Sequence, residues 1–231
     1  MKTSKIIFIT LLSTIAFLIL AALVDVRING RRRGINRDDI MSHKNALHTF
    51  RVLCINNSRN ITVTQNDSSF IEVAYLKDSI VPKVNYAMMG DTMVVSDYNS
   101  MGSVTISFPI GSPELFQRIL LKKSDMRIRN FRSEKLSLNL DQSTVWMDQY
   151  KGEKYSLSIL DVIAKNHSHF NTDDFKVDSL GIVLENSKAD IRIYAKKISG
   201  SLSDSSRIYA RQPLEISLKK DAASKINVDD Y

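Results

Sequence analysis

The sequence predicts an all-β protein, a β-solenoid built from coils of about 19 residues and preceded by an N-terminal transmembrane helix. Three observations support this fold class. The first is a long uncharged segment near the N-terminus, and the second is a serine-containing pattern that recurs along the C-terminal half. The third is the alternation of apolar and polar residues around each copy of that pattern, which is typical of half-buried strands.

The N-terminal segment is long enough to cross a bilayer. Residues 6–24 (IIFITLLSTIAFLILAALV) contain no charged side chain. As a helix they would span about 28 Å, close to the ~30 Å hydrocarbon core. A cleaved signal peptide is the alternative, but the apolar stretch is long for one and no A-x-A cleavage site follows it. We therefore expect residues 1–24 to be a transmembrane anchor or a signal segment.

Residues 25–49 are polar and basic and are expected to form a linker. Arg31, Arg32 and Arg33 are candidates for membrane-proximal contact with anionic lipid headgroups. The arginines favour a cytoplasmic body by the positive-inside rule, whereas the short lysine-containing N-terminus favours export. We expect an inner-membrane anchor with the body in the periplasm. Export to the cell surface and a cytoplasmic body are the alternatives.

Charge is concentrated at the N-terminus. Of the net charge of +7, residues 1–37 carry +6 and the remaining 194 residues carry +1. Because phosphate binding needs a concentrated basic surface, this balanced body predicts no nucleic-acid binding. Cys54 is the single cysteine, so an intramolecular disulfide is impossible. It lies in an apolar alternation and is expected to be a buried small hydrophobe.

The C-terminal half is predicted to be a repeat. Copies of the pattern serine, any residue, apolar residue start at Ser124, Ser143, Ser168, Ser187, Ser206 and Ser224, with spacings of 19, 25, 19, 19 and 18 residues. A second alternating strip follows each of the first five serines. One unit of two short strands cannot bury its apolar row alone, so we expect stacked units with parallel pairing about 4.8 Å apart. The alternative is a meander β-sandwich.

Three further expectations concern the layout of this body. We expect residues 50–109 to form an N-terminal β cap or first coils, and residues 110–231 to form the repeats and a C-terminal tail. The six-residue excess between Ser143 and Ser168 is expected to bulge as a loop within residues 165–174. The strand starting at Ser187 should lie beside the strand starting at Ser206, which places Ala189 next to Ile208 and Ile191 next to Ala210.

The order of segments resembles that of a known family. The stretches "VTQNDSSFIEV" (63–73), "GDTMVV" (90–95) and "VTISFPIGSPELFQRILLKKSDMRI" (104–128) precede the tandem serine units. Together they resemble the head GIN domain family of autotransporter adhesins, a domain of unknown function found mainly in Bacteroidota, over roughly residues 48–228. The resemblance implies a right-handed, β-helix-like fold and an exported location. It carries over no catalytic residues, and the family's turn glycines are mostly replaced in this chain.

No catalytic signature is present in the sequence. It contains no G-x-S-x-G, no phosphate-binding loop, no dinucleotide-binding glycine pattern and no calcium repeat, so we predict no catalytic residues, no cofactor and no metal. Trp146, Tyr150, Tyr194 and Tyr209 recur near equivalent positions of the units. They are candidates for contact with a protein or glycan partner, or they cover a corner of the solenoid.

These observations predict a non-catalytic, membrane-anchored protein of the cell envelope with an adhesin-like surface for an envelope protein or a glycan. A carbohydrate-active β-helix enzyme is one alternative, for which Asp125, Asp148, Asp161 and Asp190 on adjacent coils would supply carboxylates. A cytoplasm-facing tethered regulator is the other.

Overall fold

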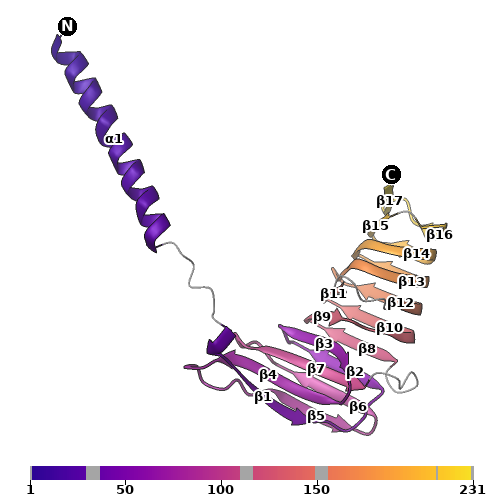
Figure 1. Cartoon of the computed structure of the whole chain (residues 1–231). Coiled ribbons are helices and arrows are strands. Elements are labelled where there is room, and N and C mark those ends of the chain that lie inside the picture. The colour runs from indigo at the N-terminus through magenta and orange to yellow at the C-terminus, as the bar shows by residue number, and fades with distance from the viewer. Residues whose placement is uncertain (1, 30–36, 110–116, 149–155, 212, 230–231) are drawn as a thin grey trace. The chain divides into compact units, whose positions relative to one another are not determined.

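The chain contains two compact units. The computed structural model describes residues 2–29, 37–109, 117–148, 156–211 and 213–229. Residues Met1–Ile40 form one unit and Met41–Tyr231 the other (Figure 1). The finer division into a linker, a cap and a repeat region stays a prediction.

The first unit contains the helix α1 (Lys2–Asn29) and a short 3-10 helix, η1 (Arg37–Asp39). At both ends α1 extends past the apolar stretch, so that it includes Lys2, Lys5, Asp25 and Arg27. Within the described residues, no helix combines the length and the apolar content that crossing a bilayer requires. This finding corrects the prediction of a transmembrane helix.

The second unit is built from strands. In chain order these are β1 (Ile40–Ala46), β2 (Val52–Asn56), β3 (Ile61–Asn66), β4 (Phe70–Leu76), β5 (Asn85–Met89), β6 (Thr92–Ser96), β7 (Ser103–Pro109), β8 (Arg118–Lys122), β9 (Asp125–Arg129), β10 (Ser133–Asp141), β11 (Thr144–Asp148), β12 (Ser156–Lys165), β13 (His169–Glu185), β14 (Lys188–Ser203), β15 (Arg207–Arg211), β16 (Glu215–Lys220) and β17 (Lys225–Asp229). Apolar and polar residues alternate along most of them, so that one side of each strand can be buried.

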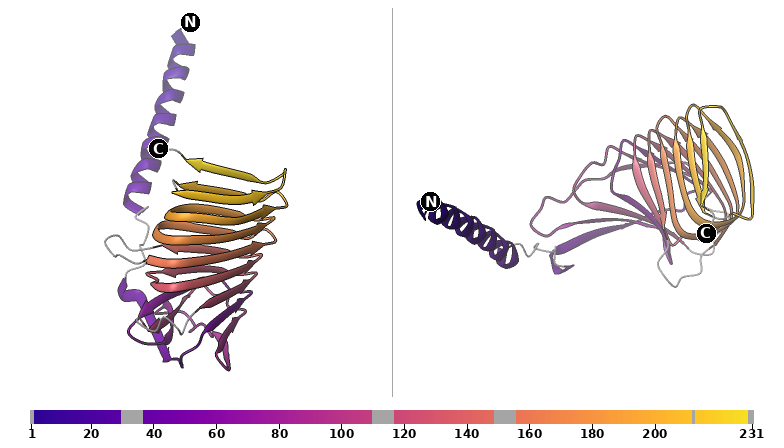
Figure 2. Two further views of the ribbon diagram at one scale, coloured as in Figure 1. Left: turned by 90° about the vertical axis from the view of Figure 1, so that its right-hand side faces the viewer. Right: turned by 90° about the horizontal axis from the view of Figure 1, so that it is seen from above.

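These strands form two mixed sheets (Figure 2). One cluster of buried hydrophobic residues lies between them. The first sheet has the order β5-β6-β2-β8-β10-β12-β13-β14-β16. The second has the order β1-β4-β7-β3-β9-β11-β13-β14-β15-β17. The long strands β13 and β14 belong to both sheets, which they connect.

The prediction of a solenoid of uniform coils is therefore wrong, and the chain is a two-sheet, sandwich-like all-β fold. The pairs β4–β7 and β5–β6 are antiparallel. Val52 of β2 pairs with Arg118, and Ile61 of β3 pairs with Met126, so the intervening residues 66–109 break any 19-residue spacing. These antiparallel pairs lie in a segment inserted between strands that pair in parallel, which is the physical reason for the difference.

The predicted parallel pairing of the serine copies is confirmed. Ala189 lies beside Ile208, and Ile191 lies beside Ala210, as expected. The six-residue excess is not where we predicted it, because residues 165–174 contain the end of β12, a short turn and the start of β13. The extra residues come between Asp148, where β11 ends, and Ser156, where β12 begins.

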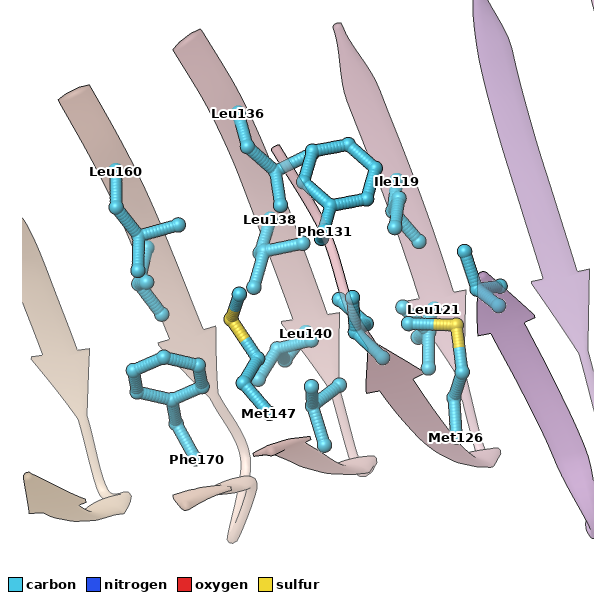
Figure 3. Packing of buried hydrophobic residues seen from close by; sticks show 14 of the residues in the cluster. Ile119, Leu121, Met126, Phe131, Leu136, Leu138, Leu140, Met147, Leu160 and Phe170 are labelled. Carbon is cyan, nitrogen blue, oxygen red and sulfur yellow. The ribbon is translucent and has the colours of Figure 1, made fainter. Parts of the chain in front are cut away.

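Rows of inward side chains form the core. Leu136, Leu160, Leu180 and Ile198 occupy one register position on successive strands and are each at most 1% exposed. Figure 3 shows Leu136, Leu138 and Leu140 projecting from one side of β10 into this cluster. On the second sheet the bulky Phe170 lies beside the small Ala189, and both are fully buried. Each large apolar side chain buried in this way contributes roughly 1.5–3 kcal/mol to folding.

Buried serines close the turns between the two sheets. The residue before each of these serines except Ser224 has a positive φ, as at Lys123, Gln142 and Asn186. The serine that follows turns inward, and its backbone N–H donates to the Oγ of the serine in the next strand layer. Each serine bonds the next in this way, with N···O distances of 3.1–3.2 Å. The donor–acceptor pairs are Ser58–Ser124, Ser124–Ser143, Ser143–Ser168, Ser168–Ser187, Ser187–Ser206 and Ser206–Ser224. Asn and Asp adopt positive φ more readily than other non-glycine residues and also favour tight turns, which explains a residue such as Asn186 at this position.

Candidate functional site

The candidate site lies on the outer face of the second sheet. At one register position, β9, β11, β13, β14 and β15 carry Arg127, Trp146, Asn171, Asp190 and Tyr209 in direct succession. Trp146 points outward because its neighbours Val145 and Met147 fill the core. Adjacent strands are about 4.8 Å apart, so this outward row is a continuous polar and aromatic strip.

Trp146 is the centre of this strip. Its side chain is 40% exposed. The Asn171 amide is assigned the orientation in which its oxygen faces a donor and its nitrogen faces acceptors. In this orientation Trp146 Nε1 donates to the Asn171 oxygen at 3.2 Å. The amide nitrogen of Asn171 then donates to Asp190 Oδ2 at 3.2 Å. This chain fixes the edge of the indole and holds its orientation before any ligand is bound.

His169 adds a titratable group to the same network. Its Nε2 lies 3.2 Å from Asp190 Oδ2 and 3.0 Å from the Asn171 amide nitrogen. A single ring nitrogen can accept from Asn171 or donate to Asp190, depending on the tautomer. The protonated ring would favour the contact with Asp190.

Asp148 orients two arginines at the edge of the strip. Its carboxylate lies 3.3 Å from Arg127 Nε and 3.3 Å from Arg129 Nε. All three side chains are partly exposed, so these ion pairs contribute little to stability. Their effect is to hold guanidinium groups beside Trp146, where they can donate hydrogen bonds to a ligand.

Two neighbouring depressions follow the strip. The first, of about 410 Å³, is lined mainly by Trp146, Asp148, His169, Asp190 and Arg192. The second, of about 460 Å³, is lined by residues of β3, β7 and β9. Arg127 and Trp146 line both, so the indole stands between two hollows on one face.

The structure brings two of the predicted contact residues together. Trp146 and the 44%-exposed Tyr209 share one row of one face. Tyr194 lies in β14 beside Lys176, and its side chain is outside the described part. Tyr150, and the predicted lipid contacts Arg31, Arg32 and Arg33, lie outside the described residues. All of these remain predictions as ligand contacts.

Sequence reasoning did not place Arg127, Asn171, His169 and Asp190 in one strip, and it considered Asp190 only as a carboxylate of an enzyme. A signal for three of them was available, because Arg127 precedes Trp146 by the same 19-residue interval that separates Asn171 from Asp190 and Asp190 from Tyr209. That interval places residues on one row once the pairing is known. The chemical link between Trp146 and Asn171 depends on side-chain orientation, which no spacing encodes.

The four carboxylates considered for an enzyme do not all lie in one groove. Asp148 and Asp190 line the first depression, and Asp125 lines the second. Asp161 lies on β12 of the first sheet and pairs with Lys135 at 3.2 Å. His167 lies in the turn before β13, near Asn186, and His169 is the first residue of β13. In the part of the chain that the structure describes, no three metal-ligating side chains come together.

Cys54 is half-buried on the outer side of β2, since its neighbours Leu53 and Ile55 take the inward positions. The prediction that Cys54 is buried in the core is therefore wrong. Burial raises the pKa of the Cys54 thiol, so that little reactive thiolate is present near neutral pH.

Comparison with known proteins places the fold among structures from Bacteroidota. No family model matches the sequence, and no curated protein does either. A solved structure from Bacteroides fragilis, to which an adhesin role is ascribed, has a TM-score of 0.60 at 12% identity and covers 84% of this chain and 99% of its own.

Two structures from Parabacteroides are also similar in fold. The first is a Parabacteroides merdae protein, again with an ascribed adhesin role, that has a TM-score of 0.51 at 10% identity and covers 84% of this chain and 98% of its own. The second is a Parabacteroides distasonis protein with an ascribed lipid-binding role, with a TM-score of 0.52 at 11% identity and the same coverage of 84% and 98%. At these identities the likeness establishes the fold.

Proposed function

We propose that this chain is a non-catalytic binding protein of the cell envelope, and that the strip around Trp146 recognises a glycan. The observation that carries the proposal is the 40%-exposed indole of Trp146, held by Asn171 between two depressions. Large, partly exposed aromatic side chains with a fixed orientation are favoured at binding surfaces because they lose little conformational freedom on binding.

The chemistry of the neighbouring side chains favours a sugar over other ligands. An indole face suits the C–H face of a pyranose ring, and its hydroxyl groups need both donors and acceptors nearby. Arg127 and Arg192 supply donors, Asp190 supplies acceptors, and Asn171 supplies both. The charged lining is unsuited to an acyl chain, so the lipid-binding role ascribed to one similar structure is not the one we propose.

The proposed location rests on the fold. Two of the similar structures carry an ascribed adhesin role, which supports a place in the envelope or at the surface. A protease added to intact cells and to osmotically shocked cells tests this. Degradation of the body only after membranes are lysed would place it in the cytoplasm and contradict the proposal.

Trp146 makes the binding test direct, because it is the only tryptophan in the chain. Neutral and acidic polysaccharides are titrated against the full chain while its intrinsic fluorescence is followed. Binding over the indole should quench or blue-shift the emission. Calorimetry then compares Trp146→Ala with Ile163→Ala, an exposed apolar residue on the other sheet.

We expect Trp146→Ala to weaken polysaccharide binding at least about tenfold, which corresponds to ~1.4 kcal/mol. Ile163→Ala should leave the affinity unchanged. Equal affinities of the two variants would rule out the Trp146 strip as the glycan site. Binding of an envelope protein, but of no polysaccharide, would assign the strip to protein recognition instead.

A further inference from the structure

The two sheets of the second unit end in exposed strands. Within the described residues, β16 pairs with β14 alone and β17 pairs with β15 alone. Figure 1 shows both strands at the same end of the stack. Their outer edges present backbone N–H and C=O groups that another strand could pair with.

The core is incompletely covered at this end. Along one inward row, Leu180 and Ile198 are at most 1% exposed, whereas the next residue, Ile216, is only partly buried. Leu218 is also partly buried, although it packs against the core. A further strand laid along β16 would bury both side chains and contribute a hydrophobic gain.

The sequence of β16 is complementary to itself when read in opposite directions. Its residues 215–219 are Glu-Ile-Ser-Leu-Lys, with Glu215, Ser217 and Lys219 exposed and the two apolar residues turned inward. In an antiparallel pair of two copies centred on Ser217, Glu215 would lie opposite the partner's Lys219, and this contact would occur twice. Ile216 would lie opposite the partner's Leu218, also twice.

From this pattern we propose that two copies of this chain associate through β16, as a two-fold symmetric antiparallel strand pair centred on Ser217. Opposite charges directly across an antiparallel pair stabilise it, and a two-fold axis makes every favourable contact occur twice. Glu215 is already oriented along the face by Lys197, 2.9 Å away. The partner's Lys219 would add a second cation to that carboxylate.

A head-to-tail arrangement fits less well. It would join β16 to β5, the strand at the other end of the first sheet. The sequence of β5, Asn-Tyr-Ala-Met-Met, offers no charge to match Glu215 or Lys219. The self-complementary contact also closes on itself, so it produces a dimer rather than a filament.

Cysteine cross-linking of the full chain tests the register. In a Cys54→Ser background, Ser217→Cys would place two cysteines opposite each other with Cα atoms about 5 Å apart, within the disulfide range. Ser199→Cys is the matched control, because Ser199 lies beside Ser217 one strand further in. Two copies of it would be about 14 Å apart, too far to form a disulfide.

Charge reversal tests the chemistry of the contact. Sedimentation of the full chain should show a dimer, and Lys219→Glu should weaken it at least about tenfold because like charges would face each other. The triple variant Lys197→Glu, Glu215→Lys and Lys219→Glu restores opposite charges both across the pair and beside residue 215, and should recover the dimer. A chain that sediments as a monomer would overturn the proposal. A dimer that Lys219→Glu leaves unchanged would also overturn it, as would equal cross-linking of the Ser217→Cys and Ser199→Cys variants. So would a strand of a different protein bound along β16.

Discussion

The backbone N–H of Ser187 donates to the Oγ of Ser206 across 3.1 Å, and that hydroxyl donates in turn to the carbonyl of Ser203 at 2.6 Å. Both serines are buried. One hydroxyl therefore satisfies a donor in the neighbouring strand layer and an acceptor in its own turn. Because buried polar groups without partners destabilise the folded state, this arrangement explains why serine recurs at these turns.

Ser206→Ala should lower the free energy of unfolding by about 1–3 kcal/mol. The substitution leaves the buried N–H of Ser187 without its acceptor. Urea denaturation followed by circular dichroism measures the change. Ser158→Ala, at an exposed position of β12, is the control and should change stability by less than about 0.5 kcal/mol. Equal losses in the two variants would show that the bond contributes nothing.

Ile208→Asp should destabilise the fold by roughly 3–5 kcal/mol, because it places an unpaired charge where the side chain has no exposed surface. Lys188→Ala, on the exposed side of the neighbouring strand, should change stability by no more than about 0.5 kcal/mol. Thermal melts of both variants provide the measurement. Similar melting temperatures would contradict the pairing of Ala189 with Ile208.

Gly200→Ala should be among the most damaging single-methyl changes in the chain. Gly200 has a φ of +143°, and an added Cβ would lie 1.8 Å from the carbonyl oxygen of Ile182. We expect a loss of at least about 3 kcal/mol, or no folded protein. Gly90→Ala is the comparison, since Gly90 also has a positive φ but no atom within 4 Å of the added group. Its cost should be about 1 kcal/mol.

Cys54 should react slowly with iodoacetamide in the folded protein. Since burial raises the pKa of its thiol, the thiolate fraction at pH ~8 is smaller than that of a free cysteine. The alkylation rate should rise with pH, and it should increase severalfold in urea, where the thiol is exposed. Mass spectrometry follows the single modification. A native rate equal to the rate in urea would refute the expected shift.

The pairing of the serine units was predictable because its signals are local. The alternation of residues such as Ala189 and Ile191 determines which side is buried, and a constant interval determines the register. The phase of an alternation is less certain when both sides are apolar. In β2, Leu53 and Ile55 face the core and Cys54 faces outward. The opposite phase, with Val52 and Cys54 inward, would also have buried apolar side chains.

The sheet order of the N-terminal region was not predictable in the same way. Its neighbours are distant in sequence, as with Val52 beside Arg118, so no short interval reports them. The antiparallel strands β4 and β5 also follow alternating patterns, which are the same for either strand direction. At the candidate site, Trp146 was foreseen because aromatic residues recur near equivalent positions of the units, whereas its hydrogen bond to Asn171 depends on one side-chain orientation.

The serine bonds have a consequence for how such a chain can change in evolution. His169 pairs with Lys188, and Lys188 pairs with Arg207, in the same register. Loss of residues 188–206 would therefore bring Arg207 beside His169 and leave Ser168 bonded to Ser187 as before. Duplication of the same segment would add one layer with equivalent bonds. Homologous recombination could thus add or remove whole strand layers. This would change the length of the stack and leave the size of each layer the same.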